Sequence, residues 1–192
     1  MKPINVGLLG IGTVGGGTFT VLSRNAEEIA RRAGRPIQIT VVADKNLELA
    51  KTVTKGACRL TDDAFSVVND PEIDIVVELI GGCGVAKELV LKAIHNGKHV
   101  VTANKALLAN HGNEIFVEAQ TQGVIVAFEA AVAGGIPIIK AVREGLTANR
   151  IEWNQNAGIE IRAQGFNAHA RGPRLQLFGA VILLQADQAN AR

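Results

Sequence analysis

Aromatic residues and net charge are both scarce in this chain. Its 192 residues include no tyrosine, one tryptophan and six phenylalanines, and 20 basic residues nearly balance 18 acidic ones. The sequence therefore has no basic stripe interleaved with aromatic residues, which is the pattern typical of nucleic-acid binding. We expect no nucleic-acid partner.

Long apolar runs and cysteines are also few. The longest clear apolar run, 177–184, is interrupted by Gly179 and falls well short of the roughly 20 residues that span a membrane. No signal peptide is expected, because residues 1–3 lead directly into a strand pattern. Cys58 and Cys83 have neither metal-ligand spacing nor partner histidines. We therefore expect no membrane partner, and reduced thiols in a cytoplasmic protein.

The stretch at residues 4–17 organises the rest of the sequence. A short apolar run ends in Gly10, Gly12 and Gly15, and a helix pattern follows directly. A strand, a glycine turn and a helix start in this order let main-chain N–H groups hold the pyrophosphate of a dinucleotide. Gly10 would form the tight turn, Gly12 would leave room for the phosphates, and Gly15 would let the helix pack close to the strand. The alternative is a strand-to-helix turn without a ligand.

Strand and helix patterns alternate through the following residues. We expect strands at 37–42, 75–80, 99–102 and 124–128, a helix whose polar continuation covers 24–34, and further helices at 47–55, 62–69, 85–96 and from 105 through 119. Short connections between such elements are typical of an α/β fold with a doubly wound parallel sheet of the Rossmann type. Ligands of these sheets bind at the carboxyl ends of the strands.

The second expected strand ends in two adjacent residues of opposite charge, Asp44 and Lys45. An acid at this place accepts hydrogen bonds from the ribose hydroxyls of NAD, whereas a cation favours the extra phosphate of NADP. The sequence gives both signals, so the cofactor is NAD or NADP. A solvated strand end without a ligand is the alternative.

Three motifs together carry a family resemblance. They are Gly-Ile-Gly-Thr-Val-Gly at 10–15, His-Val-Val-Thr-Ala-Asn-Lys-Ala-Leu-Leu-Ala at 99–109, and Phe-Glu-Ala-Ala-Val-Ala-Gly-Gly-Ile-Pro at 128–137. In this order and at these separations they resemble the N-terminal part of homoserine dehydrogenase, over residues 1 to about 153. The resemblance implies NAD(P)-linked interconversion of homoserine and aspartate semialdehyde, in the branch leading to threonine and methionine.

The resemblance also implies roles for residues of the first two motifs. Ile11, Thr13 and Val14 match the cofactor-contacting turn, and Lys105 matches a lysine placed near the nicotinamide or its phosphate. The alternative for Lys105 is a surface lysine at a helix start, where a cation is electrostatically unfavourable. Asn104, directly before it, is a plausible helix N-cap.

The third motif implies a site for a monovalent cation such as Na⁺. Its oxygen ligands would be a carboxylate oxygen of Glu129 and the main-chain carbonyls of Val132, Gly134 and Ile136. The alternative is a capping acid beside a tight loop, which opens a helix with Pro137 near its first position.

Composition changes sharply after Trp153. Residues 154–192 contain no lysine, and their arginines at 162, 171, 174 and 192 outnumber Glu160 and Asp187, so this segment holds the whole net charge of +2. We expect a dinucleotide-binding domain at 1–153 and a divergent or truncated tail at 154–192. The family's substrate domain, which would bind the small amino-acid substrate, is not recognisable there. An active dehydrogenase and a catalytically empty dinucleotide-binding module therefore both remain open, as does a homodimer.

Overall fold

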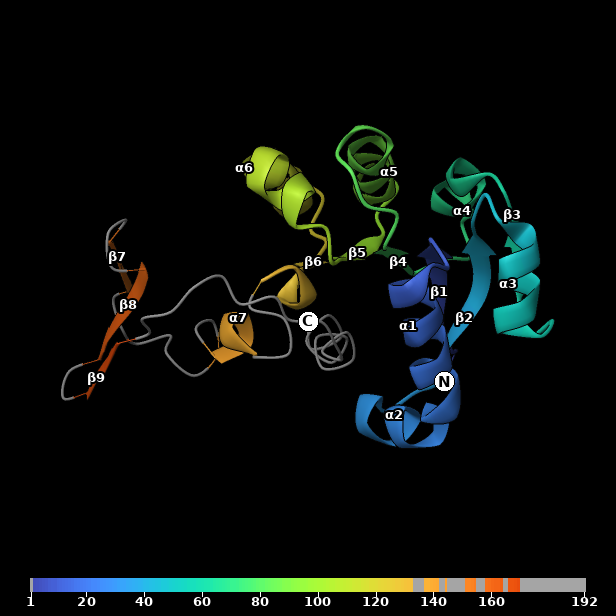
Figure 1. Cartoon of the computed structure of the whole chain (residues 1–192), viewed down its shortest axis with the longest axis horizontal. Helices are drawn as coiled ribbons and strands as arrows, with labels where there is room; N and C mark the ends of the chain where they lie inside the picture. Colours follow the sequence, from blue (N-terminus) through green and yellow to red (C-terminus); the bar gives the residue numbers. More distant parts are fainter. Residues whose placement is uncertain are drawn as a thin grey trace.

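Six parallel strands form the central sheet of the protein, in the order β3-β2-β1-β4-β5-β6 (Figure 1). The computed structural model describes residues 2–132, 137–141, 144, 151–154, 158–163 and 166–169. The strands are β1 (Ile4–Leu9), β2 (Ile37–Ala43), β3 (Arg59–Thr61), β4 (Ile75–Glu78), β5 (His99–Thr102) and β6 (Val126–Ala127). The predicted doubly wound α/β fold is confirmed.

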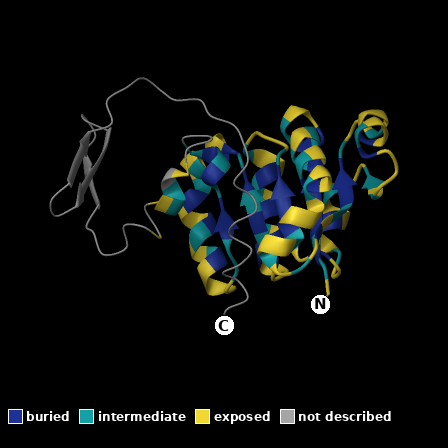
Figure 2. Cartoon of the chain, turned by 90° about the horizontal axis from the view of Figure 1, so that it is seen from below, coloured by how far each residue is buried: buried dark blue, intermediate teal, exposed yellow. Residues whose placement is uncertain are grey.

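Helices cover both faces of this sheet. One face carries α1 (Thr13–Arg24), α2 (Ala26–Ala33) and α3 (Leu47–Thr54), and the other carries α4 (Ala64–Asn69), α5 (Gly84–His95) and α6 (Lys105–Thr121) (Figure 1). Successive strand residues point to opposite faces. Val41 of β2 therefore packs in the core beneath α4, α5 and α6, and its neighbour Val42 packs beneath α1, α2 and α3. Figure 2 shows the buried strands between helices whose outer faces are exposed.

The chain beyond the sheet forms smaller elements. A 3₁₀ turn, η1 (Glu129–Ala131), follows β6, and a short helix, α7 (Ile138–Lys140), comes after it. The strands β7 (Ile151–Asn154), β8 (Gly158–Ala163) and β9 (Phe166–His169) form a separate antiparallel sheet. The predicted domain boundary at 153 falls within β7, and the division of the chain there stays a prediction.

Two element predictions were wrong in detail. The helix expected to continue through 24–34 is interrupted at Asn25, whose φ of −104° and ψ of 19° depart from helical values, so α1 ends and α2 begins there. Asparagine favours such breaks because its side chain competes for backbone hydrogen bonds. The strand β3 was not predicted, because three residues show no usable periodicity.

Other boundaries moved by a few residues. The strand expected at 75–80 ends at Glu78, and the strand expected at 124–128 contains only Val126 and Ala127.

Both cysteines are free thiols, as expected, and burial raises the pKa of Cys58. Among the described residues, no helix combines the length and apolar character needed to cross a bilayer.

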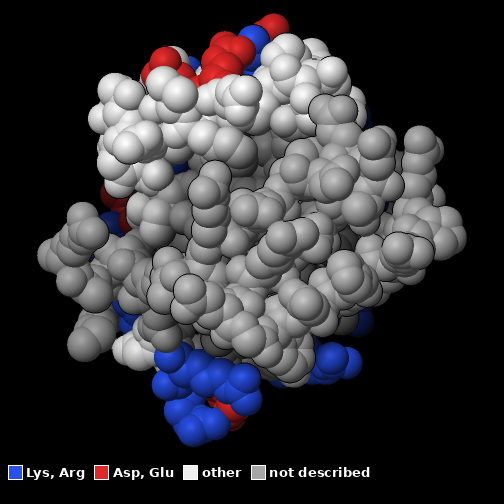
Figure 3. Space-filling view, turned by 90° about the vertical axis from the view of Figure 1, so that its left-hand side faces the viewer, with Lys and Arg blue, Asp and Glu red and all other residues white. Residues whose placement is uncertain are grey.

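Some of the charged residues pair with one another on exposed helix faces. Glu28 of α2 accepts hydrogen bonds from both Arg31 and Arg32, at 2.7–2.9 Å. In Figure 3 the blue Lys and Arg atoms gather at the lower end of the face shown, together with a red acidic group, and further acidic atoms lie at the upper end. Exposed pairs of this kind contribute little to stability, so we interpret them as a solvated helix face.

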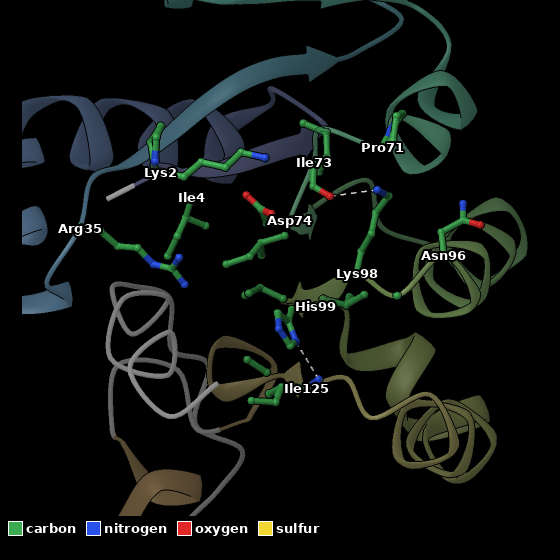
Figure 4. A pocket seen from close by; sticks show the side chains of 16 residues that line it. Lys2, Ile4, Arg35, Pro71, Ile73, Asp74, Asn96, Lys98, His99 and Ile125 are labelled. Carbon is green, nitrogen blue, oxygen red and sulfur yellow. Dashed lines mark hydrogen bonds between the residues drawn. The ribbon is translucent and has the colours of Figure 1, made fainter. Parts of the chain in front are cut away.

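A pocket of about 560 Å³ lies at the amino ends of the strands, at the edge opposite the glycine turn (Figure 4). Its wall includes the starts of β1, β4 and β5, and its charged lining residues are Lys2, Arg35, Asp74 and Lys98. Lys98 is buried, and its ammonium donates to the carbonyl oxygens of Asp70 at 2.6 Å and Ile73 at 2.9 Å. Burial lowers the pKa of Lys98, while the carboxylates of Asp70 and Asp74 oppose that shift.

His99 joins β5 to the chain entering β6 at this pocket. Its Nδ1 accepts a hydrogen bond from the Ile125 N–H at 3.0 Å, which requires an unprotonated Nδ1 (Figure 4). Burial lowers the pKa of His99, and the nearby Asp74 carboxylate only partly offsets this shift. The folded chain therefore favours neutral His99.

This arrangement predicts a pH-dependent stability. The free energy of unfolding should fall as the pH drops from about 6.5, the ordinary pKa of histidine, through the lowered pKa of folded His99. In that window the unfolded chain takes up the proton first, so unfolding is favoured. Urea unfolding between pH 5.5 and 7.5 measures the slope of the free energy of unfolding against pH. His99→Gln should flatten it, and equal slopes for wild type and His99→Gln would contradict this expectation.

Candidate functional site

The strand order reverses between β1 and β4, at the centre of the sheet. From β1 the chain continues outward through β2 to β3, and from β4 it continues the other way to β5 and β6. The helix α1 leaves β1 on one face and α5 leaves β4 on the other (Figure 1). The connections therefore part at the carboxyl ends of these two strands, which is where open α/β sheets bind their ligands.

Two glycines fix the turn between β1 and α1. Gly10 has a φ of +93°, a conformation that side chains rarely adopt, and its N–H donates to the Ala43 carbonyl at 2.8 Å. A Cβ on Gly15 would lie 1.9 Å from the Gly10 carbonyl oxygen, so α1 approaches β1 as closely as backbone allows. Packing alone therefore requires glycine at both positions.

Gly12 has no such structural reason to be glycine. Its φ of −57° lies outside the left-handed region that favours glycine, and a Cβ added there would meet no described atom within 4 Å. Gly12 is exposed and serves as the N-cap of α1 without a side-chain hydrogen bond. The space beside it opens onto the first turn of α1, where helical N–H groups have no intrahelical acceptor.

The three other residues expected in this turn have different surroundings. Ile11 is buried, and its N–H donates to Asp44 Oδ2 at 2.6 Å. Thr13 is exposed and Val14 half-buried, both in the first turn of α1. A ligand approaching from solvent would therefore meet Gly12 and Thr13, whereas the Ile11 amide is already occupied by a carboxylate.

Asp44 and Lys45, at the end of β2, point to different neighbours. The Asp44 carboxylate joins β2 to the glycine turn, since Oδ2 accepts from Ile11 and Oδ1 accepts from the Asn46 N–H at 2.7 Å. Lys45 is exposed and donates to the Asp62 carbonyl at 3.0 Å, on the side of β3. The structure thus brings Asp44, but not Lys45, against the turn.

Lys105 is the exposed first residue of α6, just past the carboxyl end of β5. The N-cap predicted for this helix is confirmed, because Asn104 Oδ1 accepts from the Leu107 N–H at 3.0 Å. The strand β4 separates β5 from β1 in the sheet. Lys105 therefore lies at the same edge as the glycine turn, on the far side of β4.

Glu78 was missed by the sequence analysis, although it is fully buried at the end of β4. Its Oε2 accepts from the Thr102 hydroxyl at 2.6 Å, and its Oε1 accepts from the Ile80 N–H at 2.9 Å. The available signal was a single acid inside the apolar run 75–80. A buried strand contains such a residue only where polar partners satisfy it.

The loop after β6 also places an acid against main-chain amides. Glu129 is buried; Oε1 accepts from the Ile139 N–H at 2.9 Å and Oε2 from the Lys140 N–H at 3.1 Å. This geometry is that of a capping acid, the alternative stated for Glu129. Val132 is half-buried, and its N–H donates to the Glu129 carbonyl at 3.1 Å. The other two expected cation ligands, Gly134 and Ile136, lie outside the described residues.

Side-chain metal sites are not found in the described part of the chain, where no three His, Cys, Asp or Glu residues gather. A site built mainly of main-chain carbonyls would not have this signature. The carboxyl edge instead offers a glycine turn, exposed helix amides and an oriented carboxylate. Together these can hold a diphosphate and a ribose.

Comparison with known proteins identifies the family. Residues 10–129 match the sequence family described as "Homoserine dehydrogenase, NAD binding domain". Among curated proteins, homoserine dehydrogenase of Pseudomonas aeruginosa is 67% identical over 153 residues, and that of Neisseria gonorrhoeae is 62% identical over 152 residues. The chain spans 35% of the length of each of these relatives, and the aligned parts cover 80% and 79% of the chain.

Solved structures give the same result. The crystal structure of a homoserine dehydrogenase from Thiobacillus denitrificans has a TM-score of 0.76 and 70% identity, covering 80% of this chain and 35% of that one. Homoserine dehydrogenase of S. aureus has a TM-score of 0.65 and 35% identity, covering 69% of this chain and 33% of that one. The strands β2 to β6 lie within the residues that match the family, and the glycine turn begins at the first of them. The chain therefore belongs to the homoserine dehydrogenase family and contains its NAD-binding domain.

Proposed function

We propose that the carboxyl edge of the sheet binds a nicotinamide dinucleotide and that the chain is the cofactor-binding part of an enzyme interconverting homoserine and aspartate semialdehyde. The observation that carries the proposal is the place of Gly12: it caps α1 at the carboxyl end of β1, where neither a left-handed φ nor packing requires a glycine. Close approach of a ligand remains as the physical reason for omitting a side chain there. The bound cofactor would supply or accept the hydride.

The residues around Gly12 have complementary roles in this proposal. The amides of Gly12 and Thr13, with the N-terminal turn of α1, hold the pyrophosphate, and Val14 lines the same turn. The Asp44 carboxylate already accepts two amides, and its remaining lone pairs accept the ribose hydroxyls of the adenosine half. NADP would additionally use Lys45, which must then exchange its bond to the Asp62 carbonyl for the extra phosphate.

Lys105 serves the other half of the cofactor. A dinucleotide that has its adenosine ribose at β2 and its diphosphate at β1 extends across β4 toward β5. Lys105, at the start of α6, then lies near the nicotinamide or its phosphate, where an ammonium acts as a point charge. Beside a reacting carbonyl, the same cation would polarise the bond or relay a proton.

The cation site stays part of the proposal. Glu129 uses one lone pair of each carboxylate oxygen for an amide, which leaves further lone pairs for a hard ion such as Na⁺. The carbonyls of Val132, Gly134 and Ile136 would complete the ligands.

Membership of the homoserine dehydrogenase family also supports three broader proposals. They are a cytoplasmic location, a homodimer, and a place in the synthesis of threonine and methionine.

A second candidate function rests on which residues the site contains. The chain spans 35% of the length of its Pseudomonas aeruginosa relative. Hydride transfer requires cofactor and substrate in a near-attack geometry, and the residues recognised here hold the cofactor only. The second candidate is therefore a dinucleotide-binding module without catalysis.

Replacing Gly12 tests the cofactor site directly. In Gly12→Ala the new methyl group occupies the proposed phosphate approach, so the affinity for NADH and NADPH should fall by at least about tenfold. The thermal midpoint should change little, because alanine at this N-cap costs about 1 kcal/mol or less. Nucleotide fluorescence titration measures the affinity.

The control is Gly17→Ala, which should bind normally. Gly17 is also in α1, and its new Cβ would also have no described atom within 4 Å. Equal affinities for Gly12→Ala and wild type would refute the site.

Removing the ammonium of Lys105 should weaken the same binding. Lys105→Ala should lose about tenfold in affinity for the reduced cofactor, about 1.4 kcal/mol, because a charge-assisted contact is lost. Lys92→Ala removes an exposed lysine from the last turn of α5, at the amino edge of the sheet, and should have no effect. An unchanged titration curve for Lys105→Ala excludes Lys105 from the site.

Turnover separates the two candidate functions. We expect this chain to bind NADPH but to oxidise it with aspartate semialdehyde at a very low or undetectable rate, because the site residues recognised in it hold the cofactor and not the substrate. The measurement is absorbance at 340 nm with and without substrate. Robust substrate-dependent oxidation would exclude the module and require a complete active site within these 192 residues.

A further inference from the structure

Glu78 occupies the point where the strand order of the sheet reverses. It pairs in register with Leu9, the last residue of β1, and with Thr102, the last residue of β5. The Leu79 N–H, directly after it, donates to the Leu9 carbonyl at 2.9 Å. Glu78 thus lies between the glycine turn after β1 and the start of α6 after β5, and its side chain is completely buried.

Three donors satisfy this buried side chain. Oε1 accepts from the N–H groups of Ile80 at 2.9 Å and Gly81 at 3.2 Å, and Oε2 accepts from the Thr102 hydroxyl at 2.6 Å. Both carboxylate oxygens of Glu78 thus have hydrogen-bond partners within the protein. The chain turns away from β4 at these amides, which explains why the strand ends at Glu78.

Hydrogen bonds continue from Glu78 into the second loop and return. Thr102 Oγ1 accepts from the Asn104 N–H at 3.0 Å. The side-chain amide of Asn104 then donates to the Gly82 carbonyl at 2.6 Å, and its oxygen caps α6. Glu78, Thr102 and Asn104 therefore connect the loop after β4 to the first residues of α6.

The loop held in this way has an unusual backbone. Gly81 and Gly82 have φ values of +83° and +72°, and a Cβ added to either would meet no described atom within 4 Å. Ile80, just before them, keeps 45% of its surface exposed at the same edge. The path of this loop is thus set by the Glu78 and Asn104 hydrogen bonds rather than by packed side chains.

Stability alone does not explain a carboxylate at this position. Burying an ionised group costs several kcal/mol before its partners compensate, and an apolar side chain of similar volume is often equally stable or better. The neighbours of Glu78 in β4, Val76 and Val77, are such apolar residues. An arrangement that fixes two loops at the ligand-binding edge gives the acid a use that an apolar residue lacks.

We propose that Glu78 is a positioning residue for the nicotinamide half of the cofactor. Through Thr102 and Asn104 it holds Gly81, Gly82 and the start of α6 as one rigid surface, on which the nicotinamide ring rests. This inference rests on the proposed function, because it assumes that a dinucleotide crosses β4 toward β5. In this proposal, residues other than Glu78 position the adenosine half and the pyrophosphate.

The test compares NADH with ADP-ribose, which lacks the nicotinamide ring. Thr102→Val removes the hydroxyl that links Glu78 to Asn104 with little change of volume, and Thr102→Ser retains it. For Thr102→Val the affinity for NADH should fall about fivefold to tenfold, whereas the affinity for ADP-ribose should change by less than about twofold. Thr102→Ser should bind both as the wild type does. Glu78→Gln, which retains an acceptor for the loop amides, should give a smaller loss that is again confined to NADH.

Calorimetric titration of each variant, with the thermal midpoint recorded alongside, distinguishes the outcomes. Equal losses for NADH and ADP-ribose, or a lowered midpoint with unchanged NADH affinity, would overturn the positioning role. If the Thr102→Val chain does not fold, the Glu78→Gln comparison decides in the same way. If the wild type binds neither ligand, the proposed function fails as well. If it binds both and the variants match it, only this inference fails.

Discussion

Carboxylates that accept main-chain amides hold the carboxyl edge of this protein together. Asp44 after β2, Glu78 at the end of β4 and Glu129 after β6 each accept two backbone N–H groups from a segment that follows a strand. An acid can satisfy two amides at once and thereby define a turn. The glycine turn, the loop after β4 and the start of α7 all depend on this interaction.

The same carboxylates lie at an edge proposed to bind an anionic cofactor. Their charge does not oppose such a ligand as strongly as the formal charge implies, since each is stabilised by amide donors within the protein. The amides left over at the start of α1 are then available to the diphosphate. Some main-chain N–H groups at the carboxyl edge thus bind the acids that fix its loops, and others are left to bind the proposed ligand.

Much of the fold could be predicted from the sequence because the strands are short apolar runs separated by glycine and by amphipathic helices. The boundaries were less accurate where a local hydrogen bond decides them: Asn25 divides a helix, and Glu78 ends a strand earlier than its apolar neighbours suggest. The strand β3 is too short to leave a periodic pattern.

The candidate site was only partly accessible to the same reasoning. The glycine motif and the N-cap at Asn104 are local features, so their spacing in the chain predicts their geometry. By contrast, the links from Asp44 to Ile11 and from Glu78 to Thr102 span 33 and 24 residues. No local pattern encodes such contacts, because they exist only when the parallel strands bring their ends to one edge. The bonds between Glu129 and the amides of α7 are more local, and a capping acid at this position was one of the two alternatives that the sequence offered.

Glu129 connects the end of the large sheet to the helix α7. Its backbone continues directly from the last strand of the large sheet, while its carboxylate is attached to the first helix beyond that sheet. The carboxylate therefore fixes the position of α7 relative to the end of β6.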